Sequence, residues 1–317
     1  MTFQITEPIL IIGIGGVGTK LAPKAKAFLN SDCLLISNDQ KDLNSDFNSI
    51  SISTKSVLNP SVQLIRNSTY QVSENIKNEI SRYSTIIILA NLAGKSGAAM
   101  APVISHLCYE ENKDVISFAI MPFKFEKDRI FQSGISLKRL RENSKCTIVL
   151  DNDALLDSNP ELSPLACHKI SNEAIFQVIS SLGTTSIPQE TNILSTSKDV
   201  QNVEESLKDS LRMLYEDAPP NSVKRSILYV LGGNNVAGGI LNSITNIASG
   251  VFNQENTSVI SSINTAEKSK VVMLSSVQGE THFDRYDPLG VISKENTLDW
   301  EQPECSIDCE LELYQLE

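Results

Sequence analysis

The sequence predicts an α/β protein built on a Rossmann-like parallel sheet, followed by a long central helix and a smaller α+β unit. Short apolar runs alternate with helical patterns through residues 9–150, and each run is apolar throughout rather than at every second position. Strands that are buried on both faces have this composition, which is typical of a parallel sheet covered by helices. A glycine-rich turn, GIGGVG, also follows the first apolar run and opens a helical stretch.

Hydrophobic periodicity predicts the elements of the first half in order. The polar, Ser- and Asn-rich residues 40–60 predict a loop or an insertion. We expect a helical stretch that follows the GIGGVG turn and runs to about residue 29, and helices over about residues 62–83, 97–111 and 129–143. We expect strands over residues 9–14, 33–37, 85–90, 115–121 and 146–150.

The second half begins with a long helical pattern from Pro164 to about residue 182, and a Thr-, Ser- and Pro-rich segment after it indicates a boundary. From about residue 287 the chain is acidic and loses periodicity, which predicts a flexible tail. Between these points we expect helices over residues 200–215 and 236–252 and strands over residues 226–231, 258–263 and 270–276. The predicted division is a first domain over residues 1–162, the central helix over 163–186, an α+β domain over 187–284 and the tail over 285–317.

Composition limits the classes of partner. The 317 residues leave room for roughly two domains. A net charge of −11 disfavours nucleic acid, which needs a basic surface. No apolar run approaches the ~20 residues that cross a bilayer, and the start MTFQITEP lacks a signal-peptide pattern, so we expect a cytoplasmic protein without membrane insertion. The pair Cys305 and Cys309 lacks the further ligands of a zinc site, and no metal site is predicted.

The first glycine-rich turn fits the pattern G-x-G-x-x-G at Gly13, Gly15 and Gly18. After a strand and before a helix, such a turn directs backbone N–H groups and the helix dipole at a phosphate. The pattern serves dinucleotides, adenylates and guanine nucleotides alike. A tight strand–helix turn without a ligand is the alternative.

A second turn, NLAGKSGAAMAP, contains the tripeptide Gly94-Lys95-Ser96 but is not a Walker A loop, because Leu89 stands where that motif needs its first glycine. The turn follows another strand of the predicted parallel sheet. The carboxyl ends of parallel strands meet at one edge, where such folds bind ligands. One nucleotide could therefore contact both turns.

These segments, with others further along, resemble the FtsZ/tubulin superfamily, and FtsZ more than tubulin. The match runs in the correct order over about residues 8 to 280. Its most specific part is PFKFE at residues 122–126, close to the Pro-Phe-x-Phe-Glu of FtsZ. The other matching segments are GIGGVG (13–18), SNDQ with Leu43 (37–43), DNDALL (151–156) and, in the second domain, residues 226–252 with GG (232–233) and LNSI (241–244).

The resemblance implies the FtsZ/tubulin fold, with a GTP-binding first domain that holds GTP or GDP, and Mg²⁺ as a candidate companion ion. Glu126 and Asn152 or its neighbour would meet the ribose, Arg129 would reach the nucleotide, and Asn172 would face the guanine edge. For each of these polar residues, a surface or helix-capping role is the alternative. The implied contact residues are Gly13, Gly15, Gly16, Val17, Asn38, Asp39, Gly94, Lys95, Ser96, Gly97, Glu126, Arg129, Asn152 and Asn172.

Two loops depart from the family pattern. The family's phosphate loop reads Gly-Gly-Gly-Thr-Gly-Thr-Gly, whereas this chain has alanine at positions 93, 98 and 99 and gains Lys95, which either offsets lost amide contacts or projects into water. The family's catalytic loop supplies two aspartates to the nucleotide of the next subunit. Here Asp199 alone fits, and Thr196 stands at the earlier acidic position. Because threonine cannot act as a base near neutral pH, we expect weak or absent hydrolysis unless Asp199, Glu204 or Glu205 substitutes.

Three functions remain open from the sequence. The first is an FtsZ/tubulin-like cytoskeletal protein, similar to an archaeal paralogue, that self-assembles or co-assembles with an FtsZ-type partner through longitudinal contacts in cell division or cell shape. The second is a non-catalytic pseudo-GTPase that serves as a scaffold or regulator with an empty pocket. The third is an adenylating or dinucleotide enzyme, for which Asp39 would bind the ribose; this reading does not explain the PFKFE segment.

Overall fold

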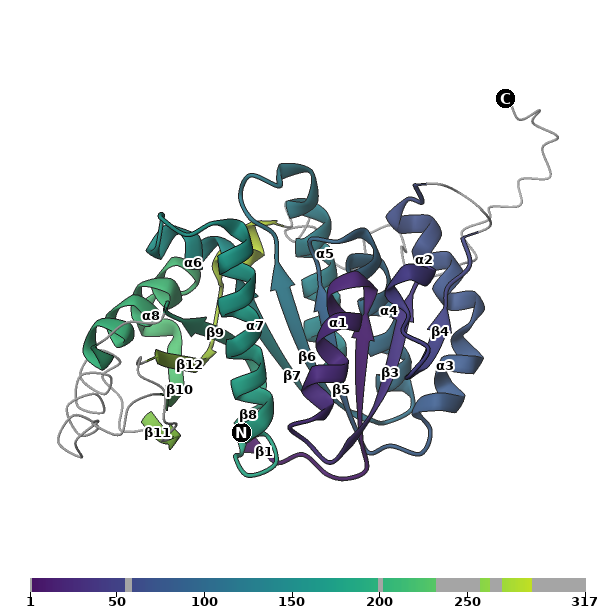
Figure 1. The fold of residues 1–317 in the computed structure, drawn as a ribbon, viewed down its shortest axis with the longest axis horizontal. Coiled ribbons are helices and arrows are strands. Elements are labelled where there is room, and N and C mark those ends of the chain that lie inside the picture. Colours follow the sequence, from purple (N-terminus) through teal and green to yellow (C-terminus); the bar gives the residue numbers. More distant parts are fainter. Residues whose placement is uncertain (1, 55–58, 199–201, 232–256, 263–269, 287–317) are drawn as a thin grey trace.

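The computed structural model describes residues 2–54, 59–198, 202–231, 257–262 and 270–286 (Figure 1). Across these residues one sheet of ten strands runs in the order β11-β10-β12-β9-β7-β6-β5-β2-β3-β4. Its strands are β2 (Ile9–Ile14), β3 (Ser31–Ser37), β4 (Asn48–Ser51), β5 (Thr85–Asn91), β6 (Asp114–Met121), β7 (Cys146–Asp151), β9 (Glu190–Thr196), β10 (Val223–Leu231), β11 (Thr257–Ser262) and β12 (Lys270–Val277). Two short strands, β1 (Thr2–Phe3) and β8 (Ile187–Pro188), pair separately.

Helices cover both faces of the sheet (Figure 1). One face packs against α1 and α7, and the other packs against α2, α3, α4 and α5. In the described residues the helices are α1 (Gly15–Lys26), α2 (Val62–Gln71), α3 (Ser73–Ile80), α4 (Lys95–Glu110), α5 (Lys127–Asn143), α6 (Asn152–Ser158), α7 (Pro164–Ser181) and α8 (Val203–Asp217), together with the short 3₁₀ turns η1 (Gln40–Asp42), η2 (Pro220–Ser222) and η3 (His282–Tyr286).

The apolar runs of the first half form the predicted parallel strands. Every residue of β2 is buried, and β2 pairs in parallel with both β3 and β5, from Ile9 opposite Ser31 and Thr85. The strands β6 and β7 extend the same parallel order. The carboxyl ends of these strands therefore lie along one edge, and the predicted α/β fold class is confirmed.

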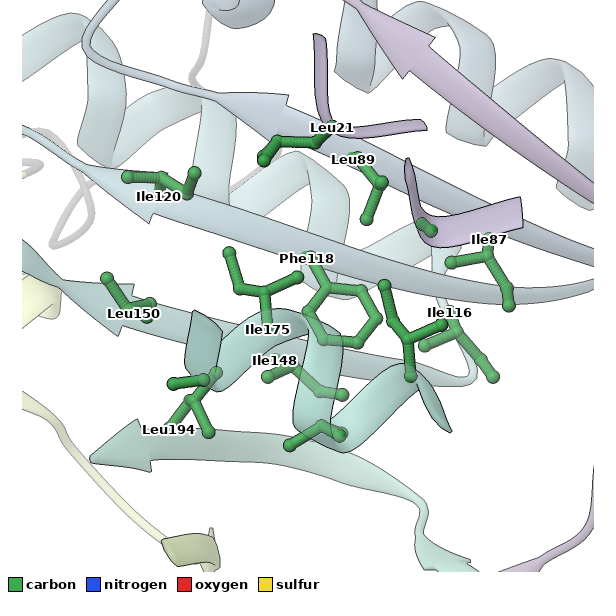
Figure 2. Close-up of a cluster of buried hydrophobic side chains, with 14 of the residues drawn as sticks. Leu21, Ile87, Leu89, Ile116, Phe118, Ile120, Ile148, Leu150, Ile175 and Leu194 are labelled. Atoms are coloured by element: carbon green, nitrogen blue, oxygen red, sulfur yellow. The ribbon is translucent and has the colours of Figure 1, made fainter. Parts of the chain in front are cut away.

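The central helix α7 covers the core on one face of the sheet. Figure 2 shows Ile175 of this helix among the strand residues Phe118 and Ile148, with Leu150 and Leu194 nearby. All five side chains are at most 2% exposed. Burying such side chains contributes about 2 kcal/mol each, so α7 is held mainly by this apolar contact.

The sheet continues without interruption beyond α7. Strand β9 pairs in parallel with β7 from Cys146 opposite Glu190, and β12 pairs antiparallel with β9. Helix α8 packs on this part of the sheet through Leu207 and Leu214. The predicted domain boundary at residues 186–187 falls between neighbouring strands of one sheet, and the division into domains stays a prediction.

Three sequence predictions need correction. Residues 40–60 are not a plain loop, because they contain η1 and the edge strand β4; this strand is short and mostly polar, and so it lacks a hydrophobic signal. Residues 62–83 form two helices that are separated at Val72. The helix α6, directly after β7, was not predicted. The predicted helix at 236–252 and the tail from residue 287 lie outside the described residues.

After β12 the chain returns across the sheet as a C-terminal strap, residues 281–286, which includes η3 and packs on α5. Arg141 of α5 donates to Asp284 at 2.9 Å and to Thr281 at 3.0 Å. Phe283 joins the core between the sheet and α5. Among the described helices, none has the length and hydropathy needed to span a membrane.

Candidate functional site

The first glycine-rich turn places the start of α1 at the carboxyl edge of the sheet. The helix has no side-chain cap and no acidic residue in its first turn. Gly15 has φ = +64°, which favours glycine. A Cβ at Gly18 would lie 2.2 Å from the carbonyl oxygen of Leu89, so glycine there lets α1 pack closely on β5. The free N–H groups of this helix end are suited to an anion.

The second turn places the start of α4 beside the first. Gly94 precedes α4 in an extended conformation, and this helix also lacks a side-chain cap. A Cβ at Gly15 would lie 2.9 Å from Cβ of Ser96, which brings the two turns into contact. Ala98 and Ala99 lie inside α4 and are buried, so their side chains belong to the helix packing rather than to the turn.

The end of β3 completes this group of loops. Ser96 Oγ donates to Asn38 Oδ1 at 2.6 Å. The side chain of Asp39 caps η1, because its Oδ1 accepts a hydrogen bond from Lys41 N. The carboxylate of Asp42 lies beside Gly16 instead, with Oδ1 3.0 Å from the place of a Cβ there.

Lys95 is exposed, and its Nζ donates to Asn59 at 2.9 Å. The side chain is therefore held beside the loop before α2 rather than extended freely into water. Its cationic head adds to the positive end of the α4 dipole, since the first turn of this helix holds no acidic residue.

Glu126 and Arg129 form a local ion pair at the start of α5. Arg129 Nη1 lies 2.7 Å from Glu126 Oε1, and Oε2 of the same carboxylate accepts from Phe123 N at 3.2 Å. The Glu126 side chain is 21% exposed, against 56% for Arg129. Contact with a ribose would have to share or replace these bonds.

Asn152 ties α6 to α7. It is buried, its Oδ1 accepts from Ser171 Oγ at 2.7 Å, and its Nδ2 lies 3.4 Å from Nδ1 of His168. Asn172, next along α7, is half-buried and makes no side-chain hydrogen bond to another described residue. Of these two residues, Asn172 therefore has its side-chain amide available for a ligand, whereas that of Asn152 is already bonded within the protein.

Aromatic rings line this second group of residues. Phe123 stacks on Phe125 with ring centroids 4.9 Å apart, and it meets His168 edge to face at 5.4 Å. Phe125 is 61% exposed, and Leu165 of α7 is also exposed. Burial lowers the pKa of His168, against the opposing influence of the Glu126 carboxylate, so the ring is neutral at pH 7.

The predicted catalytic residue Asp199 lies outside the described residues. Thr196, just before it, is fully buried at the end of β9, where its backbone N–H meets Met213 Sδ at 3.3 Å. Glu204 and Glu205 stand in the first turn of α8, whose cap is Asn202. None of these placements tests catalysis.

The predicted residues that the structure describes thus fall into two groups at one edge of the sheet. Sequence reasoning missed several neighbours that shape them. His168 was detectable because it precedes Asn172 by four residues and so shares its helix face. The contact of Asp42 with Gly16 had no local signal, since it depends on how η1 folds back. The missed residues are Asp42, Asn59, Phe123, Phe125, His168 and Ser171.

Comparison with known proteins gives one matching family model. Residues 8–160 match the GTPase domain of the Tubulin/FtsZ family. The chain is 24% identical over 189 residues to cell division protein FtsZ 2 of Halobacterium salinarum, covering 56% of this chain and 47% of that protein. It is 27% identical over 125 residues to FtsZ 2 of Methanocaldococcus jannaschii, covering 39% and 33%. The chain spans about half the length, or less, of these curated relatives.

Solved structures of the same family share the fold. An empty FtsZ dimer of M. jannaschii superposes with a TM-score of 0.70 at 17% identity, over 86% of this chain and 89% of that one. A GTPγS-bound protofilament of CetZ2 from Haloferax volcanii gives 0.66 at 14% identity, over 88% and 96%. Residues 8–160 therefore match the GTPase domain of the Tubulin/FtsZ family, and the chain is FtsZ-like in sequence and in fold.

Proposed function

We propose that this protein binds a guanine nucleotide, GTP or GDP, at the carboxyl edge of the sheet and assembles in the cytoplasm with itself or an FtsZ-type partner. One observation carries the proposal. The uncapped starts of α1 and α4 meet at this edge, joined by the contact between Gly15 and Ser96. Two helix N-termini that face one place form an anion site that suits neighbouring phosphates.

The residues at this edge fit a nucleotide. The turns at Gly15 and Gly94 would hold the phosphates through backbone N–H groups, with Lys95 as an added positive charge. Asn172 would meet the base, and the pair of Glu126 and Arg129 would meet the ribose. No group of three His, Cys, Asp or Glu side chains in the described part of the chain could hold a metal, so Mg²⁺ would enter with the phosphates.

Hydrolysis is proposed to be weak or absent. The nucleotide brings the phosphoanhydride bond, and cleavage needs a carboxylate that positions water against it. Thr196 stands buried where the resemblance places the first such carboxylate. Assembly would occur through longitudinal contacts, in cell division or cell shape, and would not depend on rapid turnover.

A second candidate is a scaffold that holds no nucleotide. The specific observation is the Asp42 carboxylate beside Gly16, where its charge would repel a phosphate. Asn152 and Glu126 also already have protein partners. In this case the protein would assemble without binding a nucleotide.

Calorimetric titration with GTP, GDP and ATP tests the nucleotide. We expect the wild type to bind GTP or GDP in preference to ATP, and Lys95→Glu to weaken binding at least about tenfold through charge reversal near the phosphates. The matched control is Lys224→Glu, which makes the same charge change at an exposed position of β10 and should stay within about twofold of the wild type. If the folded wild type binds no guanine nucleotide, the nucleotide proposal is refuted and the scaffold without a nucleotide is the remaining candidate.

Sedimentation and phosphate release test assembly. We expect pelleting polymers at high protein concentration, with turnover far slower than assembly. Pelleting that is independent of added nucleotide would favour the scaffold. Rapid phosphate release would contradict the proposal of weak hydrolysis.

A further inference from the structure

Three carboxyl groups are buried together at the end of β7. Asp151 is the last residue of this strand, Asp153 follows in the first turn of α6, and Asp217 ends α8. They are 2%, 4% and 2% exposed. Carboxylates are seldom buried this fully unless they are paired or protonated.

Asp153 is paired with Lys124. Its Oδ1 accepts from Lys124 N at 2.9 Å, and Lys124 Nζ lies 2.8 Å from its Oδ2. Lys124 also pairs with Asp157. The cation in this cluster is therefore already shared between two acids, and its charge offsets the effect of burial on the pKa of Asp151 only in part.

Asp151 and Asp217 face one another. Asp151 Oδ1 accepts from Asp153 N at 2.9 Å. Neither oxygen of Asp217 receives a donated hydrogen bond from another described side chain or backbone group, and the carboxyl that it meets is that of Asp151. Two buried carboxylates offer only acceptors to each other, whereas one proton between them makes one a donor.

The C-terminal strap closes over this pair. Tyr286 is 8% exposed, and its hydroxyl has no partner among the described residues. The charged and titratable groups around the pair are Lys124 from the loop before α5, Asp153 and Asp157 from α6, Glu216 from α8, and His282 and Tyr286 from the strap, with Arg285 beside His282.

The electrostatics agree with a retained proton. Burial raises the pKa of Asp151 to about 7. Burial, and then the neighbouring Asp151, raise the pKa of Asp217 well above its ordinary range. The same acids, after burial, raise the pKa of Tyr286, which stays a neutral phenol.

We propose that Asp151 and Asp217 form a proton-dependent latch that fastens the end of α8 and the C-terminal strap to the end of β7. While the pair holds a proton, the two carboxyl groups share a hydrogen bond and the strap closes over them. Once both groups are ionised, two negative charges without a free cation occupy one dry site, and the end of α8 and the strap separate from β7. The latch does not depend on the proposed nucleotide.

Its position connects two parts of the molecule. Asp153, within the cluster, holds the backbone of Lys124 in the loop that also carries Phe123 and Glu126. The other side of the latch is α8, which follows the region of Asp199. Opening the latch would therefore loosen both the Glu126 loop and α8.

Hydrogen exchange on the intact chain at pH 6, 7 and 8 tests the latch. Opening returns the carboxyl groups to water and releases their protons, so protection must fall as pH rises. After correction for intrinsic exchange rates, we expect protection of the last turns of α8 and of residues 281–286 to fall at least about tenfold from pH 6 to pH 8. The amides of β5, which is separated from β7 by β6, serve as the internal reference.

Variants assign the effect to the pair. In Asp217→Asn the amide donates to Asp151 at every pH, so the pH dependence of protection should largely disappear. The matched control is Asp209→Asn on the same helix, which removes a carboxyl that is 8% exposed and lies 3.7 Å from Arg212 instead of near Asp151. This control should keep the wild-type pH dependence.

Equal protection at pH 6 and pH 8 in the wild type would overturn the latch, as would an unchanged pH dependence in Asp217→Asn. If that variant does not fold, a ¹³C carboxyl NMR titration of the wild type decides. Two aspartate carboxyl groups that titrate above pH 6 support the latch. A spectrum in which all aspartates titrate near their ordinary pKa refutes it.

Discussion

Gly97 offers a direct test of why glycine remains in the second turn. A Cβ at this position would lie 2.0 Å from the carbonyl oxygen of Asn91 and 2.8 Å from its carbonyl carbon. Both atoms are backbone at the end of β5, so no side chain can rotate away. In Gly97→Ala the start of α4 must move from β5 by about 1 Å before the contact becomes even a tight one.

The cost of that movement follows from what α4 buries. Ala99, Met100 and Val103 pack in the core between α4 and the sheet, and all are at most 1% exposed. Overpacking a core of this kind costs about 1 to 3 kcal/mol, and the rigid carbonyl places the effect at the upper end. For a chain of 317 residues we expect a melting temperature lower by about 3 to 5 °C.

Thermal unfolding followed by circular dichroism, without nucleotide, measures the effect. Gly94→Ala is the matched control, because a Cβ there would lie 3.6 Å from the same carbonyl oxygen, at ordinary contact distance, and its φ is −87°. It should melt within about 2 °C of the wild type. Equal melting temperatures for Gly97→Ala and the wild type would refute the packing argument. The glycine at position 97 would then be explained by the close approach of a ligand.

Three further outcomes are expected. Glu190 has φ = +93°, so Glu190→Gly should raise the free energy of unfolding by about 1 kcal/mol, read from urea midpoints. The pKa of Asp151 in the folded state is raised to about 7, so the folded chain binds more protons than the unfolded chain between pH 5 and pH 7. As the pH rises through this range, this group alone should lower the free energy of unfolding by about 2 kcal/mol. A free energy of unfolding that stays constant in urea titrations at these pH values would contradict the prediction. Ser96→Ala removes the 2.6 Å bond to Asn38 and should cost about 1 kcal/mol in the same assay.

The sequence was sufficient for the parallel core because its strands are apolar throughout. The apolar side chains of Ile9–Ile14 and Cys146–Asp151 leave water only if both faces of each strand are covered, and every residue of both strands is buried in the structure. By contrast, β4 (Asn48–Ser51) exposes most of its residues at the edge of the sheet, and its pairing with β3 comes from backbone bonds that leave no trace in composition.

The candidate site was predictable in its turns but not in its side-chain contacts. Gly15 and Gly94 follow strands, and strand direction alone brings them to one edge. The engagement of Asn152 by Ser171, and of Glu126 by Arg129, depends on the distance between helices or on rotamers. The burial of Asp217 against Asp151 joins residues far apart in the chain, and an isolated sequence pattern could not show it.

The parallel pairing of β9 with β7 has a consequence during synthesis. Strand β7 ends at Asp151, but the residues that cover its outer edge begin at Glu190. At ~5–20 residues per second the ribosome needs roughly 2 to 8 seconds to make the intervening segment. Throughout that interval the nascent chain holds an uncovered strand edge, which invites pairing with other chains. A fragment that stops before residue 190 would keep this edge permanently, and we expect it to aggregate.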